Sequence, residues 1–267
     1  MKKKYTLVCL LLAASMSLTA CELIPFEDPE AQRAKAETTE AVVVLPDPKE
    51  ALGSDRVYHQ ELRNQAGTLL ATYETRMPSF STAEPHGEIF REINSHYDLE
   101  FSEGPADCES LFQVVQRHHG PEWELLETVD GVFSVRYTYE LLPTPEKYIC
   151  IQKKYTYQTD LGGGYTRYYP DVFLAENGWR LSFGALFGHN ADKASGMALA
   201  GIRTWCEEND VPYEKLDGLT AADFTDFYAM DAEHLIFYAE PFMLSTNDGM
   251  AYVIKLSIRD FSGMFIE

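Results

Sequence analysis

The sequence predicts an α+β fold in which antiparallel sheets carry helices packed on one face, and which could divide into two small subdomains. Apolar and polar residues alternate over residues 132–142, which is the period of a half-buried strand. Over residues 192–209 the apolar residues recur at helical spacing and line one face. The chain also holds 16 Tyr and 15 Phe in 267 residues, and aromatic residues favour sheets.

Turn signals separate the predicted strands. Asp130-Gly131 and Asn177-Gly178 are typical of two-residue hairpins, and residues 64–67 form another turn-like stretch. Gly162-Gly163-Gly164 ends one strand, and Asn247-Asp248-Gly249 precedes the last. The segments predicted as strands are 57–62, 68–77, 122–129, 132–142, 148–158, 165–176, 179–183, 235–238 and 250–258.

Three helices are predicted between these strands. The first begins near residue 84 and carries an apolar residue at four-residue steps. The second follows the break at Gly104-Pro105 and ends near His119, because Gly120-Pro121 interrupts helical structure. The third covers residues 192–209.

The chain begins with the features of an export signal. Lysines at positions 2–4 precede an apolar run over residues 5–14, which is shorter than the roughly 20 residues of a membrane-spanning helix. Leu18-Thr19-Ala20-Cys21 resembles the lipobox of bacterial lipoproteins, in which the Cys sulfur receives a diacylglyceryl group. We expect residues 1–20 to be a lipoprotein signal peptide and Cys21 the lipidated residue. The alternative is an ordinary secretory signal, in which Cys21 is only a nearby thiol.

Behind Cys21 the sequence predicts a tether and then a folded part, held at the extracytoplasmic face of the cell membrane. Residues 21–54 contain four prolines and acidic stretches, and Val42-Val43-Val44 could form a short strand. A flexible spacer of this kind lifts a folded part off the membrane surface. The folded part is predicted as an N-terminal α+β subdomain over residues 55–165 and a C-terminal one over residues 166–267.

The charge of the chain limits its partners. The formal net charge is −20, from 42 Asp and Glu against 22 Lys and Arg. Such a surface repels the phosphates of nucleic acid, so no nucleic-acid partner is expected. The charge favours a cationic partner or simply keeps the protein soluble, and solubility is the simpler explanation.

Cysteines and histidines form no recognisable metal-binding pattern. Cys108, Cys150 and Cys206 remain after the signal and Cys21, and their spacing matches no zinc motif. Buried apolar thiols are the first expectation, one disulfide the second and metal binding the third. His118 and His119 end a predicted helix, where adjacent side chains point about 100° apart and do not readily bind one metal.

The search for catalytic motifs finds none. The sequence lacks a Gly-x-Ser-x-Gly elbow, a His-Glu-x-x-His motif, a Walker loop and a Cys-x-x-Cys pair. Gly162-Gly163-Gly164 lies between predicted strands, whereas a phosphate cradle needs a following helix N-terminus. We therefore expect no catalytic residue, no cofactor and no metal. Acids that could form a hydrolytic pair only if the fold brings them together are Glu207, Glu208, Asp223 and Asp226.

From about residue 56 to 258 the sequence resembles a known pair of extracellular modules. The stretches that carry the resemblance are 73–78 with Glu92-Ile93-Asn94, 158–165, 173–187, 223–241 and 252–258. The modules form the RsiV/PdaC-like family, found in the lysozyme-sensing anti-sigma factor of Gram-positive bacteria and ahead of the catalytic domain of some peptidoglycan deacetylases. Residues 162–165 lack the family's His, so no role of that His is carried over.

The resemblance implies a non-catalytic binding or sensing module at the cell surface. Because the anti-sigma factor binds lysozyme, a cationic protein, the partner could be a protein of that kind or peptidoglycan. An envelope hydrolase of unrecognised type and a structural envelope subunit are the alternatives. A hydrolase predicts a concave pocket with convergent titratable groups, and a structural subunit predicts a large exposed apolar patch. A binder predicts a broad aromatic or acidic surface with no such cluster of titratable groups.

Overall fold

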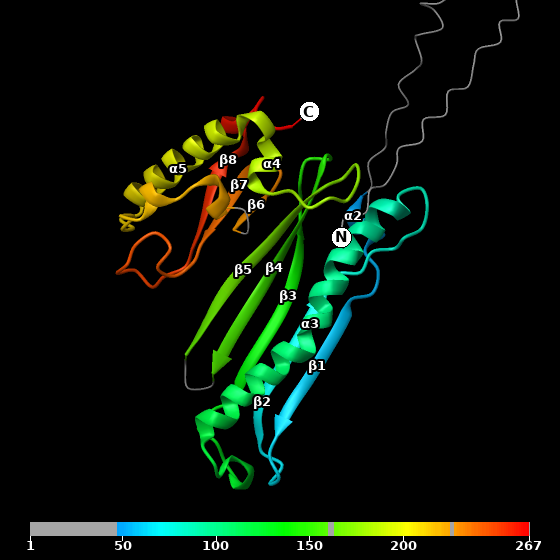
Figure 1. Ribbon diagram of the computed structural model, residues 1–267, viewed down its shortest axis with the longest axis vertical. Coiled ribbons are helices and arrows are strands. Elements are labelled where there is room, and N and C mark those ends of the chain that lie inside the picture. Colours follow the sequence, from blue (N-terminus) through cyan, green and yellow to red (C-terminus); the bar gives the residue numbers. More distant parts are fainter. Residues whose placement is uncertain (1–46, 160–162, 225–226, 267) are drawn as a thin grey trace, which may run out of the picture. The chain divides into compact units, whose positions relative to one another are not determined.

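The computed structural model describes residues 47–159, 163–224 and 227–266. The predicted signal peptide 1–20, Cys21 and Val42-Val43-Val44 lie outside these residues. In the described part the predicted α+β fold is confirmed, with one five-stranded sheet, one three-stranded sheet and a few helices (Figure 1). No helix in these ranges combines the length and the apolar character needed to cross a membrane.

Strands that follow one another in sequence are neighbours in both sheets. The larger sheet consists of β1 (Arg56–Arg63), β2 (Leu69–Met77), β3 (Phe133–Leu142), β4 (Tyr148–Thr159) and β5 (Gly164–Leu174). The smaller sheet consists of β6 (Tyr228–Met230), β7 (His234–Ala239) and β8 (Tyr252–Ser257). The α-helices are α2 (Pro48–Ala51), α3 (Gly87–His119), α4 (Phe183–Phe187) and α5 (Ala191–Glu208). Strand β6 has no counterpart among the predicted strands.

Strands β2 and β3 pair in parallel, and α3 forms the connection that such a pair requires. The predicted hairpin at Asp130-Gly131, with a strand over residues 122–129, is therefore wrong. Those residues contain a short 3-10 helix instead. The Asn64 side chain donates hydrogen bonds to the carbonyls of Trp123 and Leu126, so this backbone is bound to the turn between β1 and β2.

Helix α3 is continuous, whereas the sequence predicted two helices separated at Gly104-Pro105. Gly104 is buried, and a Cβ there would lie 3.2 Å from the Thr75 Cγ2, so the helix backbone packs closely on β2. Packing of the whole buried stripe outweighs the interior proline, which costs about 3 kcal/mol. The helix ends at His119, as predicted. The buried residues of the stripe are Gly87, Phe90, Ile93, Tyr97, Gly104, Cys108 and Val115.

The beginning of β4 is buried on both faces of the larger sheet. Ile149 and Ile151 pack with apolar residues of α3, whereas Tyr148 and Cys150 pack with residues of α5 and the smaller sheet. Because side chains alternate across a strand, two-sided burial explains the unbroken run of four buried residues. At this end, α3 covers one face of the larger sheet, and the smaller sheet with α5 covers the other.

The chain leaves β5 through the predicted Asn177-Gly178 turn, in which Gly178 has a φ of 76°. The strand predicted over residues 179–183 is wrong. A single bridge joins Phe173 to Arg180, and α4 then begins. Ser182 determines this start because its hydroxyl accepts a backbone N–H of the first turn of α4.

Residues 47–54, predicted as the end of the tether, contact the folded part. The Asp47 side chain caps α2, and the N–H of Gly53 donates to the Ser79 carbonyl at 2.7 Å. The predicted subdomain boundary between residues 165 and 166 falls inside β5. The division into two subdomains stays a prediction.

Candidate functional site

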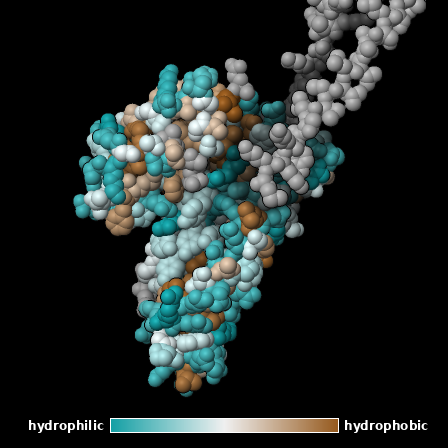
Figure 2. Space-filling model, viewed as in Figure 1, coloured by the Kyte–Doolittle hydropathy of each residue, from teal (hydrophilic) through white to brown (hydrophobic). Residues whose placement is uncertain are grey.

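A groove of about 430 Å³ lies between α3 and the face of the larger sheet that α3 covers, and we call it the α3 groove. Its walls come from α3 and from β2, β3, β4 and β5. In Figure 2 the surface over β4 and β5 beside α3 is pale, the shade of residues with intermediate hydropathy. The lining side chains that carry chemistry are the tyrosines Tyr73, Tyr137 and Tyr169, the acids Glu100, Glu103, Asp107 and Asp171, and the cations Lys153 and Arg180.

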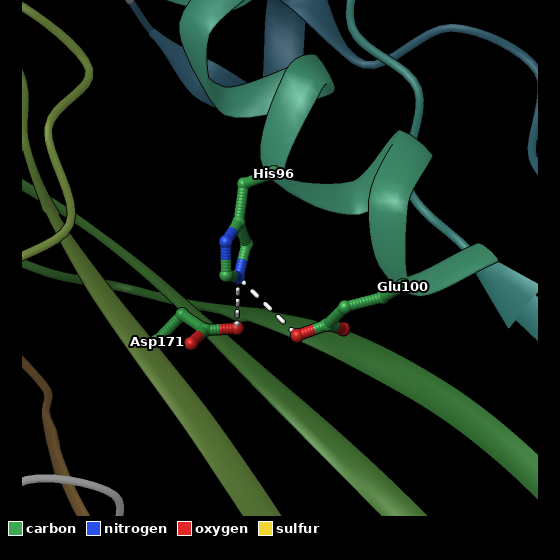
Figure 3. A group of neighbouring side chains, drawn as sticks. All are labelled: His96, Glu100 and Asp171. Atoms are coloured by element: carbon green, nitrogen blue, oxygen red, sulfur yellow. Dashed lines mark ion pairs between the residues drawn. The ribbon is translucent and has the colours of Figure 1, made fainter. Parts of the chain in front are cut away.

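Ion pairs between α3 and the sheet lie among the residues that line the α3 groove. Figure 3 shows those that join His96 to Glu100 and to Asp171. The Lys153 Nζ lies 2.5 and 2.7 Å from the two carboxylate oxygens of Glu100 and 2.9 Å from the Asp171 Oδ2. The Arg180 Nε donates to the Asp171 Oδ1 at 2.6 Å. The His96 Nε2 lies 3.3 Å from Glu100 and 3.5 Å from Asp171. Asp171, whose side chain is 1% exposed, therefore contacts three basic side chains.

These contacts shift the pKa values of the network toward the charged forms. Burial alone would raise the pKa of Asp171, but His96 and the charges of Lys153 and Arg180 lower it well below its ordinary value. Burial would also raise the pKa of Glu100, but His96 and Lys153 outweigh it and lower that pKa. Burial alone would lower the pKa of His96, but the two carboxylates outweigh it and raise the pKa to about 9.

The same network contains a group of potential metal ligands. His96, Glu100 and Asp171 offer ligand atoms within 4.8 Å of one another in the described part of the chain. However, the Lys153 ammonium already lies within 2.9 Å of both carboxylates, where a cation would bind. A metal would also require neutral His96, and its pKa of about 9 keeps the imidazole protonated at neutral pH. The geometry therefore favours an ion-pair network over a metal centre.

Tyrosine rings form the floor of the α3 groove. The ring centroids of Tyr73 and Tyr137 are 6.1 Å apart with a tilt of 52°, and Tyr155 lies 4.8 Å beyond Tyr137. Burial, reinforced for Tyr73 by the nearby charge of Asp107, raises the pKa of Tyr73 and Tyr137 well above the ordinary value. Tyr73 is 2% exposed, and its hydroxyl makes no hydrogen bond to a described residue. The floor thus presents the half-buried, neutral ring of Tyr137 and the hydroxyl of Tyr73.

Two acids of α3 line the groove without a cationic partner among the described residues. Glu103 and Asp107 are four residues apart, so they lie on the same side of the helix. Burial, followed by the negative charge of Glu103, raises the pKa of Asp107. Glu103 and Asp107 are both exposed, and Lys153 is held by Glu100 and Asp171, so neither carboxylate has an ion pair with a described residue.

This arrangement is better suited to binding a cation than to transferring a proton. The hydrolase hypothesis predicts a concave site with shifted pKa values, and the α3 groove has both. However, general acid–base catalysis works best with a pKa near the working pH. His96 has a pKa of about 9, and the pKa values of Glu100 and Asp171 are lowered, so these groups stay charged and bound to one another at neutral pH.

A second, more apolar groove of about 390 Å³ lies between β5 and the ends of β7 and β8. Exposed apolar side chains gather around it: Tyr165, Met250 and Val253 line it, and the Phe242 ring approaches its Gly249. Exposed apolar side chains of this kind are what the structural-subunit hypothesis predicts.

The described cysteines are buried free thiols, which was the first expectation from the sequence. Burial raises the pKa of Cys150 to about 12, so this thiol is not a nucleophile near neutral pH. Cys21, the one predicted modification site, lies outside the described residues. The three free thiols are Cys108, Cys150 and Cys206.

The predicted histidine pair and glycine run lie outside the α3 groove lining. His118 and His119 end α3, and both rings contact the ring of Phe133. Strand β5 begins at Gly164, the last glycine of the run, so a strand and not a helix follows the run, and no helix N-terminus is available there for a phosphate. A Cβ at Gly164 would lie 2.7 Å from the Tyr157 carbonyl oxygen, which explains the glycine by close approach of two backbones.

Two of the acids singled out in the sequence accept hydrogen bonds from neutral groups in the described chain. Asp223 accepts hydrogen bonds from the N–H and hydroxyl of Thr220, both at 2.7 Å. Glu207 and Glu208 lie at the end of α5, where Glu207 accepts a hydrogen bond from a tyrosine hydroxyl. Asp226 lies outside the described residues.

The sequence analysis missed the α3 groove, although two signals point to it. His96 and Glu100 are four residues apart within a helical pattern, which places both on one side of the helix. Lys153 in β4 and Asp171 in β5 are charged residues at strand positions whose side chains point to the face of the sheet that α3 covers. A charge at a core-facing strand position needs a partner, and these two are partners of each other.

Comparisons with known proteins give fold likeness alone. No protein-family model matches the sequence, and no curated protein matches it. A DUF3298-family protein from Bacteroides fragilis NCTC 9343 has a similar structure, with a TM-score of 0.49 and 11% identity over 81% of this chain and 94% of that chain. A DUF3298-family protein from Pseudomonas aeruginosa PAO1 is similar with a TM-score of 0.44 and 12% identity over 84% of this chain and 95% of that chain.

Proposed function

We propose that the protein is a surface-anchored lipoprotein whose extracytoplasmic part is a non-catalytic binding module for a cationic protein. The α3 groove is the observation that supports this proposal. It combines the carboxylates of Glu103 and Asp107, which have no cationic partner among the described residues, with neutral tyrosine rings. Both kinds of group attract cations. The net charge of −20 also favours the approach of a positively charged partner.

Lysozyme is the partner to test first, and peptidoglycan is the second. The resemblance to the RsiV/PdaC-like family supports both choices, because its members sense lysozyme or accompany peptidoglycan deacetylases. Lysozyme fits the charge of the α3 groove better, since electrostatic complementarity accelerates association and selects between partners.

Binding to immobilised lysozyme and to purified peptidoglycan tests the proposal. We expect the purified protein, kept in mild detergent, to be retained on lysozyme at low salt and to be released as salt rises, because screening weakens exposed charge pairs. The double variant Glu103→Gln/Asp107→Asn should lose at least tenfold in affinity. Absence of retention on both materials at low salt would contradict the proposed function.

A matched control separates local recognition from general acidity. The double variant Glu88→Gln/Glu109→Gln removes the same charge from exposed positions of the same helix that do not line the groove. We expect it to bind like the unmodified protein. Equal losses in the two double variants would assign the binding to net charge and would contradict the α3 groove as the site.

The membrane anchor is tested at Cys21. We expect Cys21→Ala to be released into the medium or to remain unprocessed, because the diacylglyceryl group needs the Cys sulfur. Fractionation of cells that express the variant, with the unmodified chain beside it, measures this outcome. Normal processing and membrane retention of Cys21→Ala would contradict lipidation at this residue.

A further inference from the structure

We propose that the α3 groove binds the guanidinium of an arginine side chain, held between the carboxylates of α3 and the tyrosine floor. This inference rests on the proposed function, since it takes the α3 groove as the binding site and names what enters it. Three features of the groove support it: its charge, a tyrosine hydroxyl that makes no hydrogen bond to a described residue, and a half-buried tyrosine ring.

The charge of the groove favours one monovalent cation near Asp107. Of its two basic side chains, Lys153 is bound by Glu100 and Asp171, and Arg180 donates to Asp171. These contacts leave Glu103 and Asp107 as the carboxylates with no ion pair to a described residue. Both side chains are exposed to the groove. Partial burial and the negative charge of Glu103 raise the pKa of Asp107, so a cation beside it would stabilise its charged form.

Tyr73 provides a second, independent indication of a ligand. Its side chain lines the groove and is 2% exposed, and its hydroxyl makes no hydrogen bond to a described residue. The hydroxyl oxygen is not fully enclosed by protein, so it reaches the open space of the groove. The charge of Asp107 acts on this hydroxyl, so a ligand with several N–H donors could satisfy Tyr73 and Asp107 together.

The half-buried ring of Tyr137 suits a flat cation. Its centroid lies 6.1 Å from that of Tyr73, and Tyr73, at 2% exposed, offers its hydroxyl to the groove rather than a ring face. A guanidinium stacks on aromatic faces, carries five N–H donors in one plane and is weakly hydrated. An ammonium is compact and strongly hydrated, so it gives up more solvation on entering a groove half made of aromatic rings.

Small ligands test the inference directly. The purified protein is titrated with N-acetyl-arginine amide, with its lysine counterpart, and with its citrulline counterpart, which has the same shape without the charge. Changes in the NMR signals of the tyrosine rings report binding. We expect arginine amide to bind at least tenfold more tightly than citrulline amide and severalfold more tightly than lysine amide. Equal binding of arginine and citrulline amides, or of arginine and lysine amides, would overturn the inference.

Variants locate the site. Asp107→Asn should weaken arginine amide binding about tenfold, and Tyr73→Phe should weaken it severalfold while leaving the aromatic face in place. Glu109→Gln, an exposed change on the same helix, should have no effect. Circular dichroism and the thermal midpoint establish that each variant is folded. Unchanged binding in folded Asp107→Asn would overturn the inference.

The outcome also separates this inference from the proposed function. If lysozyme binds but arginine amide neither binds nor competes with it, the guanidinium inference fails and the proposed function stands. If arginine amide binds in the groove but lysozyme and peptidoglycan are not retained, the inference stands and the proposed partners are wrong.

Discussion

Lys153 and Asp171 are diagonal neighbours on two adjacent strands. Lys153 pairs with Tyr169 across β4 and β5, and Asp171 pairs with Ile151, so both charged side chains lie on the face that α3 covers. Their closest atoms are 2.9 Å apart. Because Asp171 is 1% exposed, this ion pair is buried, and together with the contact of Lys153 to Glu100 it links the sheet to α3 beside the α3 groove.

Removing the charge of Asp171 should strongly destabilise the protein. Asp171→Asn removes the buried carboxylate charge that Lys153, Arg180 and His96 contact, and breaking a buried pair on one side costs about 3–5 kcal/mol. Urea denaturation of the variant measures this loss. Glu109→Gln is the control, since an exposed substitution changes stability by less than about 0.5 kcal/mol. A loss below about 1 kcal/mol for Asp171→Asn would show that the network contributes little to the folded state.

Stability should fall as the pH rises from about 6.5 to 9 because of His96. The folded state raises its pKa from 6.5 to about 9, so the imidazolium contributes stability that is fully present below pH 6.5 and is lost as the pH passes 9. The shift corresponds to at most about 3 kcal/mol. Urea midpoints measured across this range should decline in the unmodified protein.

His96→Gln should remove most of that decline, because the variant has no imidazole to deprotonate. His59→Gln is the matched control: His59 is half-exposed on β1 and takes no part in the network, so its variant should keep the decline. A pH profile of His96→Gln that parallels the unmodified protein would mean that other groups cause the loss of stability.

Two glycines should respond to alanine with opposite signs. Gly178 has a φ of 76°, and a Cβ there would lie 2.5 Å from the Ile89 carbonyl oxygen of α3, so Gly178→Ala should destabilise by more than about 1 kcal/mol. Gly196 lies within α5 with no atom within 4 Å of its would-be Cβ, so Gly196→Ala should stabilise by about 0.5–1 kcal/mol. Thermal midpoints of both variants measure the effects, and effects of equal sign would contradict these environments.

Thiol counting should distinguish lipidated from unmodified protein. Cys108, Cys150 and Cys206 are buried, so the folded protein should react slowly with a thiol reagent. After denaturation, protein that has been cut before Cys21 and lipidated should titrate three thiols. Protein cut at the same place without lipid should titrate four, because Cys21 is then available, and that count would contradict lipidation.

Local sequence patterns predicted the helices and strands well where burial of one face determines the element. The alternation in β3 and the helical spacing in α5 each follow from burial of one face, and both elements formed as predicted. The hairpin predicted at Asp130-Gly131 was wrong, because a turn-like dipeptide does not show which strand the next segment will pair with. The helix break predicted at Gly104-Pro105 was also wrong, because Gly104 packs against β2 and the helix continues through Pro105.

The sequence by itself determined the α+β class, most strands and the acidic balance, and it predicts the anchor at Cys21, because these depend on composition or on residues close together in the chain. The tertiary structure alone decided the parallel pairing of β2 with β3 and the content of the α3 groove. Glu100, Lys153 and Asp171 come from three separate elements, and their charges are compatible with burial only together. No local pattern in a single chain shows which distant charges will meet, so the groove became visible only in the folded chain.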